Sequence, residues 1–158
     1  MPVHLRPVTR ENLHDCLALQ VAPEQTSFVA SVAKSLAEAY VDPNLQPYAV
    51  YDESARGHEA TSEPVVGFAM VQIVAGVGFV QRLLIGADYQ KRGYGRATML
   101  EMIRRLRMHP DVETVATSHR KGNQQMARLC KGLGFVPWEI DFATSDGLEV
   151  FLIHEPAI

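Results

Sequence analysis

Apolar residues along the chain alternate with polar ones or form short runs bounded by turn residues, and this pattern predicts strands. The pair Ala75-Gly76 separates two of these segments by a tight turn, and Asp146-Gly147 precedes the last of them. The predicted strands cover residues 3–8, 47–52, 64–74, 77–85, 112–117, 138–142 and 148–153.

Between the strands, apolar residues recur at helical spacing. Thr9 is the expected N-cap of a first helix, a second follows Pro23 and ends at Pro43, a third follows Gly95, and a fourth begins at Asn123. The buried stripes expected for them are Leu13, Cys16 and Leu17; Val29, Val32, Ala33, Leu36 and Tyr40; Met99, Met102, Ile103 and Leu106; and Met126, Leu129, Cys130 and Leu133. Residues 53–63 are expected to form a surface loop.

Strands and helices in this order predict an α/β protein with a mixed sheet and helices on both faces. The 158 residues fit one domain, 1–158, because no linker or internal repeat divides them. A hydrophobic fraction of 47% with 21% charged residues is typical of a globular chain that buries a core.

Charge and cysteine content narrow the classes of partner. A formal charge of −3 and a pI near 6.0 argue against a nucleic-acid-binding protein and suit a cationic substrate. Cys16 and Cys130 lack CxxC spacing, which favours a reduced, cytoplasmic protein. Neither a signal-peptide core nor an apolar run of membrane-spanning length is present in the sequence, so we expect no membrane association.

The segment with the clearest chemistry is 90–96, Gln-Lys-Arg-Gly-Tyr-Gly-Arg, between the strand 77–85 and a helix. The first turn of a helix presents unpaired N–H groups and partial positive charge, which together attract an anion. Gly93 and Gly95 lack the Cβ atoms that would keep phosphate oxygens away, and Lys91, Arg92 and Arg96 add cations. The pattern therefore indicates a site for a pyrophosphate.

The same residues also fit a plain strand-to-helix turn that needs glycine only for its φ angle, and the local pattern leaves both readings open. The dinucleotide fingerprint G-x-G-x-x-G is incomplete, because Thr98 stands at its third glycine position. A Walker sequence is absent as well, since no Gly-Lys-Ser/Thr follows.

Two motifs in the same order resemble the GNAT superfamily of N-acetyltransferases. The first is the strand followed by Gln90-x-x-Gly93-x-Gly95, and the second runs from Asn123 to Leu133-Gly134-Phe135. The resemblance implies a mostly antiparallel central sheet that splays at the cofactor strand, and acetyl-CoA as co-substrate. The acetyl-CoA contacts that it implies are Leu83, Leu84, Ile85, Gln90, Lys91, Arg92, Gly93, Tyr94, Gly95, Arg96 and Asn123.

The N-terminal third has a narrower resemblance. Segments 5–12, 21–30 and 35–40 are similar to bacterial spermine/spermidine (diamine) N-acetyltransferases, which implies a polyamine acceptor. Glu24, Gln25 and Phe28 would then face the substrate. A helix cap and ordinary packing account for these three residues almost as well.

Acetyl transfer to an amine requires a base, an oxyanion donor and protonation of the departing thiolate. The family's strand glutamate is missing here, so the sequence assigns no base, although Glu24, Asp52, Glu139, Asp141 and Glu149 are candidates. We expect the oxyanion donor to be a backbone N–H near Leu84 or Ile85. Arg82, the charged residue of this apolar strand, is expected to meet a carboxylate if it points inward.

The family's tyrosine that protonates the thiolate is replaced by Cys130. A thiol is acidic enough in principle for this step, but a buried free cysteine usually acts as a small hydrophobic residue. Arg120 and Lys121 could meet phosphates or form an ordinary basic loop. The six histidines lack metal-binding spacing, so we expect no metal.

These observations predict a cytoplasmic enzyme that acetylates a primary amine of a small molecule, with a polyamine as the expected acceptor. Two alternatives stay open. One is another acceptor, such as an amino acid, a protein N-terminus or an aminoglycoside. The other is a catalytically weak acyl-CoA sensor, suggested by the missing tyrosine and glutamate. The C-terminal hairpin is compatible with a homodimer.

Overall fold

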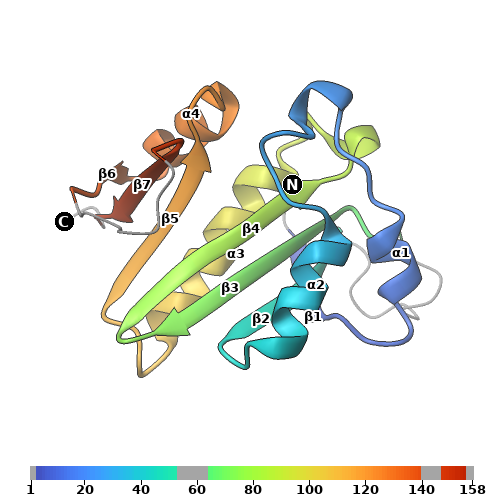
Figure 1. Ribbon diagram of the computed structural model, residues 1–158, viewed down its shortest axis with the longest axis horizontal. Helices are drawn as coiled ribbons and strands as arrows, with labels where there is room; N and C mark the ends of the chain where they lie inside the picture. Colours follow the sequence, from blue (N-terminus) through green and yellow to red (C-terminus); the bar gives the residue numbers. More distant parts are fainter. Residues whose placement is uncertain (1–2, 53–63, 140–146, 156–158) are drawn as a thin grey trace.

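The computed structural model describes residues 3–52, 64–139 and 147–155 and contains a seven-stranded mixed sheet of order β1-β2-β3-β4-β5-β7-β6 (Figure 1). All neighbouring strands are antiparallel except β4 and β5. The strands are β1 (Val3–Pro7), β2 (Leu45–Asp52), β3 (Gly67–Val74), β4 (Val77–Ile85), β5 (Thr114–Arg120), β6 (Phe135–Pro137) and β7 (Glu149–His154). The helices are α1 (Leu13–Leu17), α2 (Val32–Val41), α3 (Tyr94–Met108) and α4 (Gln124–Gly132), with short 3-10 turns η1 (Pro23–Gln25) and η4 (Ala87–Tyr89).

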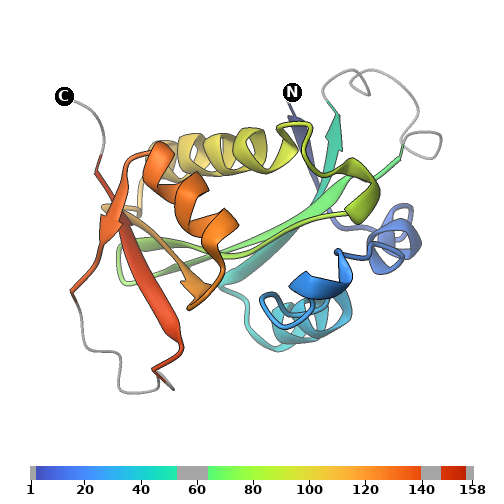
Figure 2. The same ribbon diagram turned by 90° about the horizontal axis from the view of Figure 1, so that it is seen from above.

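Helices cover both faces of the sheet, as the sequence predicts (Figure 2). The face under α3 and α4 holds one apolar cluster, which includes Met99, Met102 and Ile103. The opposite face, under α1 and α2, holds a second cluster around Phe68 and Met70. Because each helix buries one stripe, the central strands are apolar on both sides.

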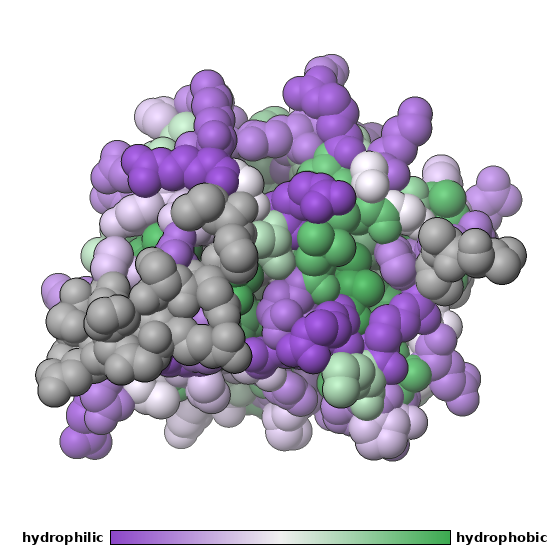
Figure 3. Space-filling view, turned by 180° about the vertical axis from the view of Figure 1, so that it is seen from behind, coloured by the Kyte–Doolittle hydropathy of each residue, from purple (hydrophilic) through white to green (hydrophobic). Residues whose placement is uncertain are grey.

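The expected α3 stripe is confirmed, since Met99, Met102, Ile103 and Leu106 are all buried. Two large apolar side chains of this helix, Leu100 and Met108, stay exposed. From behind, apolar surface gathers in one area bordered by hydrophilic side chains (Figure 3). No helix within the described residues is long and apolar enough to span a membrane.

A β-bulge interrupts the pairing of β3 with β4. Met70 pairs with Arg82, whereas the next residue, Val71, pairs with Val80, so Gln81 is the extra residue. A bulge reverses which side chains face which side of the sheet. Accordingly, Val80 packs in the cluster under α3, but Leu84 packs under α2.

Beyond the bulge, β4 separates from β5. The two strands pair in parallel only from Val77–Thr114 to Val80–Thr117. At the last pair the Thr117 hydroxyl donates to the Val80 carbonyl at 2.9 Å. Figure 1 shows the two strands diverging from there, which is the splay that the sequence resemblance implies.

The first two helices differ from the prediction. Asn12, not Thr9, precedes α1, and the Asn12 side chain accepts the Thr9 N–H at 2.8 Å in a turn before the helix. Residues 23–25 form only a single 3-10 turn, and α2 begins at Val32 after the N-cap Ser31. Tyr40 is 91% exposed, because the buried side of α2 runs through Val32 and Ser35 instead.

The C-terminal segments also differ. Among the described residues near the predicted strand 138–142, β6 covers Phe135–Pro137, and Trp138 and Glu139 lie outside a strand. Residues 140–142, the predicted loop 53–63 and Asp146 lie outside the described residues. In α4 only Cys130 is fully buried, whereas Met126, Leu129 and Leu133 are half-buried.

His154, at the end of β7, connects this strand to two helical segments. Its Nε2 lies 3.0 Å from the Leu133 carbonyl, and an Arg107 N–H lies 2.9 Å from its Nδ1. A carbonyl only accepts and a guanidinium only donates, so this geometry requires neutral imidazole with the proton on Nε2. Burial, with a further contribution from Arg107, lowers the pKa of His154 below its ordinary 6.5.

We predict that stability falls as the pH drops through the His154 transition. The unfolded chain takes up the proton near pH 6.5, while the folded chain takes it up only at lower pH, so acid favours unfolding in that interval. Urea denaturation of the wild type and His154→Gln at pH 7.5 and pH 5.5 measures this. The variant should lose less unfolding free energy on acidification; an equal loss would contradict the assignment.

Candidate functional site

The segment between β4 and α3 forms a left-handed turn directly before a long helix. Gly93 is the N-cap of α3 with φ 88°, a conformation that favours glycine, and Lys91 also has a positive φ of 63°. No side chain caps the helix at Gly93. The first N–H groups of α3 are therefore available to an external acceptor.

Gly95 has no such conformational reason to be glycine, because its φ is not positive. A Cβ at this position would lie 3.9 Å from the Ile85 side chain and 4.0 Å from that of Leu129, which is ordinary contact. The fold itself would accept alanine. What glycine adds here is open space beside the helix N-terminus, where Gly95 lines a cavity.

The cations of this segment are exposed. Lys91 and Arg96 line the cavity with Gly95 and form no ion pair within the part of the chain that the structure describes. Arg92 instead lies over the Tyr89 ring, 5.9 Å from its centre. The Tyr94 hydroxyl is directed away from the cavity, since it donates to Asp52 at 2.7 Å.

Gln90 connects this segment to β4 and to the residues before α2. Its Nε2 donates to the Ile85 carbonyl at 2.9 Å and to the Gln25 side chain at 2.7 Å. Gln25 in turn donates to Gln125 on α4 at 3.1 Å. The three amides thus join segments on both sides of the gap between β4 and β5.

Two cavities meet where β4 and β5 diverge. The first, of about 290 Å³, lies along the helix N-terminus and is lined by the 83–85 backbone, the 89–96 segment and α4. The second, of about 630 Å³, lies between β4, β5, β7 and the start of α2. Both sizes suit small-molecule ligands. The residues common to both linings are Phe28, Val29, Leu83, Asn123 and Met126.

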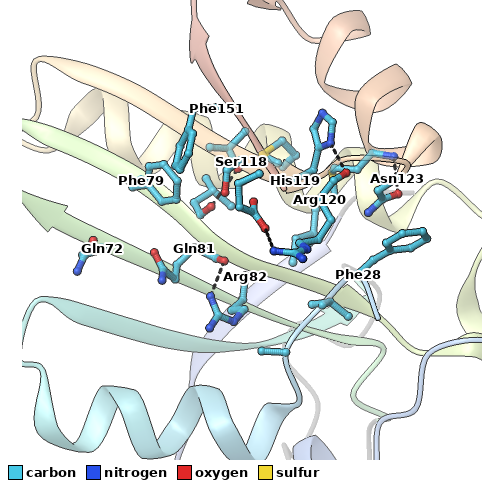
Figure 4. A pocket seen from close by; sticks show the side chains of 18 of the residues that line it. Phe28, Gln72, Phe79, Gln81, Arg82, Ser118, His119, Arg120, Asn123 and Phe151 are labelled. Carbon is cyan, nitrogen blue, oxygen red and sulfur yellow. Dashed lines mark hydrogen bonds and ion pairs between the residues drawn. The ribbon is translucent and has the colours of Figure 1, made fainter. Parts of the chain in front are cut away.

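The larger cavity has an aromatic wall and a polar wall (Figure 4). Phe79 and Phe151 pack with ring centres 6.4 Å apart, and Phe28 approaches from the segment before α2. Figure 4 shows Gln81 and Arg82 reaching the cavity from β4 and Ser118 and Arg120 reaching it from β5, while the His119 ring lies at the edge of the cavity beside the Arg120 carbonyl.

The direction of the β4 backbone at the junction follows from two hydrogen bonds. The Gly86 N–H donates to Val66 at 2.9 Å, on the β3 side. Since backbone groups alternate along a strand, the Leu84 N–H also points towards β3, whereas those of Leu83 and Ile85 point into the gap. The Ile85 carbonyl confirms this direction, because it accepts from Gln90 there. The expectation of Leu84 as oxyanion donor is corrected accordingly.

Asn123 begins α4 at the junction. Its Oδ1 accepts the Met126 N–H at 3.2 Å, so the expected N-cap role is confirmed. The side chain also lines both cavities, and its amide N–H groups remain able to donate to a ligand. Met126 and Leu129 line the smaller cavity, which explains why these residues of the predicted buried stripe are only half-buried.

The three residues that were expected to face the substrate lie in different places in the structure. Phe28 lies at the junction of the two cavities. Gln25 belongs to the smaller cavity and bonds to Gln90. Glu24 is exposed and is absent from both linings.

Cys130 lies in the core and lines neither cavity. It is 0% exposed, and burial raises the pKa of its thiol to about 11. A buried thiol with a raised pKa is poorly placed to protonate a departing thiolate. The structure therefore supports the packing interpretation and corrects the catalytic one.

The charged residues near the cavities also have defined partners. Arg82 donates to Glu38 on α2 at 2.7 Å, which confirms the expected carboxylate partner. Arg120 lies 3.4 Å from Glu149 in the larger cavity rather than beside the helix N-terminus, and Lys121 is exposed. No group of three His, Cys, Asp or Glu side chains within residues 3–52, 64–139 and 147–155 could hold a metal ion.

Of the proposed bases, only Glu149 lines the larger cavity; Asp52 bonds to Tyr94, Glu139 is exposed, and Asp141 lies outside the described residues. Sequence reasoning did not single out Lys34, Gln81 or His119 as site residues, yet all three line this cavity. They come from three separate elements. Only the chain topology brings them together, so no local motif signals them.

Comparisons with known proteins agree with this geometry. A model of the Acetyltransferase (GNAT) family matches residues 13–135. The NAA60 protein from Arabidopsis thaliana, solved with a bisubstrate analogue, superposes with a TM-score of 0.69 at 16% identity, covering 96% of this chain and 98% of that chain. A search of curated proteins found no match.

Two further solved structures are similar. Spermidine N-acetyltransferase from Vibrio cholerae, in complex with CoA and spermine, has a TM-score of 0.65 and 15% identity, with 96% of this chain and 93% of that chain covered. A putative streptothricin acetyltransferase from Bacillus anthracis, in complex with acetyl coenzyme A, has a TM-score of 0.68 and 13% identity, with 99% of each chain covered. At these identities the likeness establishes the fold.

We predict that Gly95→Ala weakens coenzyme A binding without destabilising the protein. A methyl group would occupy the space beside the helix N-terminus, and an overpacking cost of about 1–3 kcal/mol corresponds to a rise in Kd of roughly 5-fold to 150-fold. Isothermal titration calorimetry with coenzyme A measures this Kd.

The matched control is Gly132→Ala, which adds the same methyl group at the end of α4, where no atom lies within 4 Å. This variant should bind coenzyme A like the wild type. Unchanged affinity in Gly95→Ala would show that no ligand approaches this glycine.

Proposed function

The chain belongs to the Acetyltransferase (GNAT) family and is an acetyl-CoA-dependent N-acetyltransferase, and from this premise we propose that it transfers the acetyl group directly to an amine bound in the larger cavity. The smaller cavity would hold acetyl-CoA. The amine would attack the thioester while both substrates are bound. Holding the two reactants in one geometry supplies much of the rate of such a reaction.

The observation that carries this proposal is the junction of the two cavities at Leu83. Both linings include Leu83 and Phe28, so a thioester in one cavity and an amine in the other would meet there. The splay of β4 from β5 provides the opening between them.

For acetyl-CoA, the residues that support this placement lie along one path. The α3 N-terminus, Lys91 and Arg96 suit the pyrophosphate, because unpaired N–H groups and cations gather there. The backbone of residues 83 and 85, exposed towards the gap, suits the amide groups of the pantetheine arm, and Asn123 adds side-chain N–H groups beside it. Arg92 lines neither cavity and the Tyr94 hydroxyl bonds to Asp52, so neither of these polar groups is part of the proposed cofactor contacts.

The oxyanion donor that we propose is the Leu83 N–H. It points into the gap at the junction of the cavities, whereas the Leu84 N–H points towards β3. In the tetrahedral intermediate the thioester oxygen becomes negative, and a fixed backbone N–H stabilises it without reorganisation. Attack of the amine forms the carbon–nitrogen bond of this intermediate. Its collapse restores the carbonyl and breaks the carbon–sulfur bond, so that the CoA thiolate leaves.

We assign removal of the amine proton to His119. This residue lines the larger cavity, and its Nδ1 lies 2.9 Å from the Arg120 carbonyl. Because a carbonyl only accepts, this contact places a ring proton on Nδ1, so that in the neutral imidazole the lone pair is on Nε2. That lone pair can take the proton directly or through one water molecule. Glu149, the other lining group that could accept a proton, is already paired with Arg120.

The acceptor is a primary amine, and a polyamine is the narrower hypothesis from the sequence. The names of two of the similar structures specify different substrates, spermidine and streptothricin, so the fold does not select among acceptors. A catalytically weak acyl-CoA sensor remains the second candidate, because neither the family's tyrosine nor its strand glutamate is present.

One experiment separates these functions. Release of CoA thiol from acetyl-CoA is followed with polyamines, amino acids, peptides and aminoglycosides, while calorimetry measures acetyl-CoA binding. An enzyme should bind acetyl-CoA and release CoA in the presence of at least one amine. Binding without amine-dependent release would favour the sensor, and absence of binding would contradict the assignment of the smaller cavity.

We predict that His119→Gln lowers kcat about a hundredfold, the usual size of a general-base contribution, while Kd for acetyl-CoA stays within twofold. Glu149→Gln is the comparison variant. A larger loss of kcat in Glu149→Gln than in His119→Gln would make Glu149 the base.

A further inference from the structure

We propose that the acceptor amine carries an acidic group, as a free amino acid does, and that Lys34 and Arg82 select for it. This inference rests on the proposed function, because it takes the larger cavity as the acceptor site. It replaces the polyamine, a polycation, with an acceptor that has one amine and one carboxylate.

The first argument is the balance of charge in the cavity. Its lining within the described residues includes three cationic side chains, Lys34, Arg82 and Arg120, and one carboxylate, Glu149. Glu149 is paired with Arg120 at 3.4 Å. Arg82 is paired with Glu38, which lies outside the lining, so Lys34 is the cation that has no carboxylate partner among the described residues. A polycation would therefore meet one excess positive charge and would find both nearby carboxylates already engaged. Repulsion of this kind is an effective means of excluding a ligand.

The second argument is the burial of Arg82. Its side chain is 14% exposed and relies on Glu38 for its charge partner, at 2.7 Å. A polyamine that took Glu38 for itself would leave a buried guanidinium without a counter-ion, which is strongly unfavourable. Both carboxylates near the cavity, Glu38 and Glu149, are thus already paired with arginines of the protein.

The third argument is that Arg82 and Lys34 keep N–H groups that can donate to a ligand. Arg82 uses Nη2 for Glu38 and Nη1 for the Gln81 carbonyl at 3.0 Å, while its buried Nε has no partner. Nη1 and Nη2 each carry a second N–H, and these two donors remain for an acceptor's carboxylate, whereas the buried Nε is shielded from the cavity. Lys34, in the first turn of α2, adds an ammonium group that forms no ion pair among the residues that the structure describes.

The aromatic side chains of the larger cavity indicate which further group the acceptor carries. Phe79 and Phe151 form a tilted pair with an interplanar angle of 48°, and Phe28 lies at the junction. Aromatic rings can hold either an apolar side chain or an ammonium group, so these rings alone do not decide. Together with the excess of cations, they fit an amino acid with an apolar side chain.

The test compares each free L-amino acid with its own amide, which keeps the side chain and amine but removes the carboxylate. CoA release at saturating acetyl-CoA gives kcat/KM for each member of a pair, corrected for the fraction of unprotonated amine. For the best acceptor, the acid should exceed the amide by about tenfold or more, the size expected for losing a charged hydrogen-bond partner. Spermidine and putrescine should be poorer than this acid.

Lys34→Glu tests the selecting residue, and Lys131→Glu, an exposed change on α4 outside both linings, is its matched control. The acid-to-amide ratio should fall about tenfold or more in Lys34→Glu and stay unchanged in Lys131→Glu. A purely structural effect would lower both members of a pair equally and leave the ratio unchanged. An unchanged ratio in Lys34→Glu would remove Lys34 from the proposal.

The outcomes distinguish this inference from the proposed function. If amides or polyamines are better acceptors than every free acid, the acidic-acceptor inference is overturned while amine acetylation stands. If acetyl-CoA binds but no amine in any class releases CoA, the proposed transfer itself fails, and the inference fails with it.

Discussion

The separation of β4 from β5 is the constraint on which the site depends. Two adjacent strands normally satisfy each other's backbone groups, and unpaired groups in a protein interior are costly. Here the parallel ladder stops at Val80 and Thr117. Beyond it, Gln90 satisfies the Ile85 carbonyl, while the other groups facing the gap are left for a ligand that can take the place of the missing strand.

The bulge at Gln81 determines which side chains and backbone groups of β4 face the gap between β4 and β5. Without the extra residue, the side chains and backbone groups of residues 82–85 would exchange sides. Arg82 could not then reach Glu38 on α2, and Leu84 rather than Leu83 would face the gap. One inserted residue therefore determines both the direction of the expected oxyanion donor and the position of the Arg82 side chain in the larger cavity.

The sequence predicted the parts of the site whose chemistry is local. The segment 90–96 could be recognised because glycine spacing, cations and a helix start lie within one short stretch, and Asn123 could be recognised as a helix cap. The direction of the 83–85 backbone could not be predicted, because a bulge leaves no clear sequence signal at Gln81. The cavity around Lys34, Phe79 and His119 depends on contacts between distant elements. Tyr40 was predicted to be buried but is exposed, because the buried side of α2 runs through Val32 and Ser35.

The hydrogen bonds of Gln25 have a consequence for the binding of a ligand in the smaller cavity. This side chain bonds both to Gln90, beside the Gly93 turn, and to Gln125 on α4, while Phe28 follows it in sequence by three residues. A ligand that enters the smaller cavity and takes over either amide releases one end of this bridge. The first ligand to arrive would thus change the contacts of Gln25, which lies three residues before Phe28 at the junction of the two cavities.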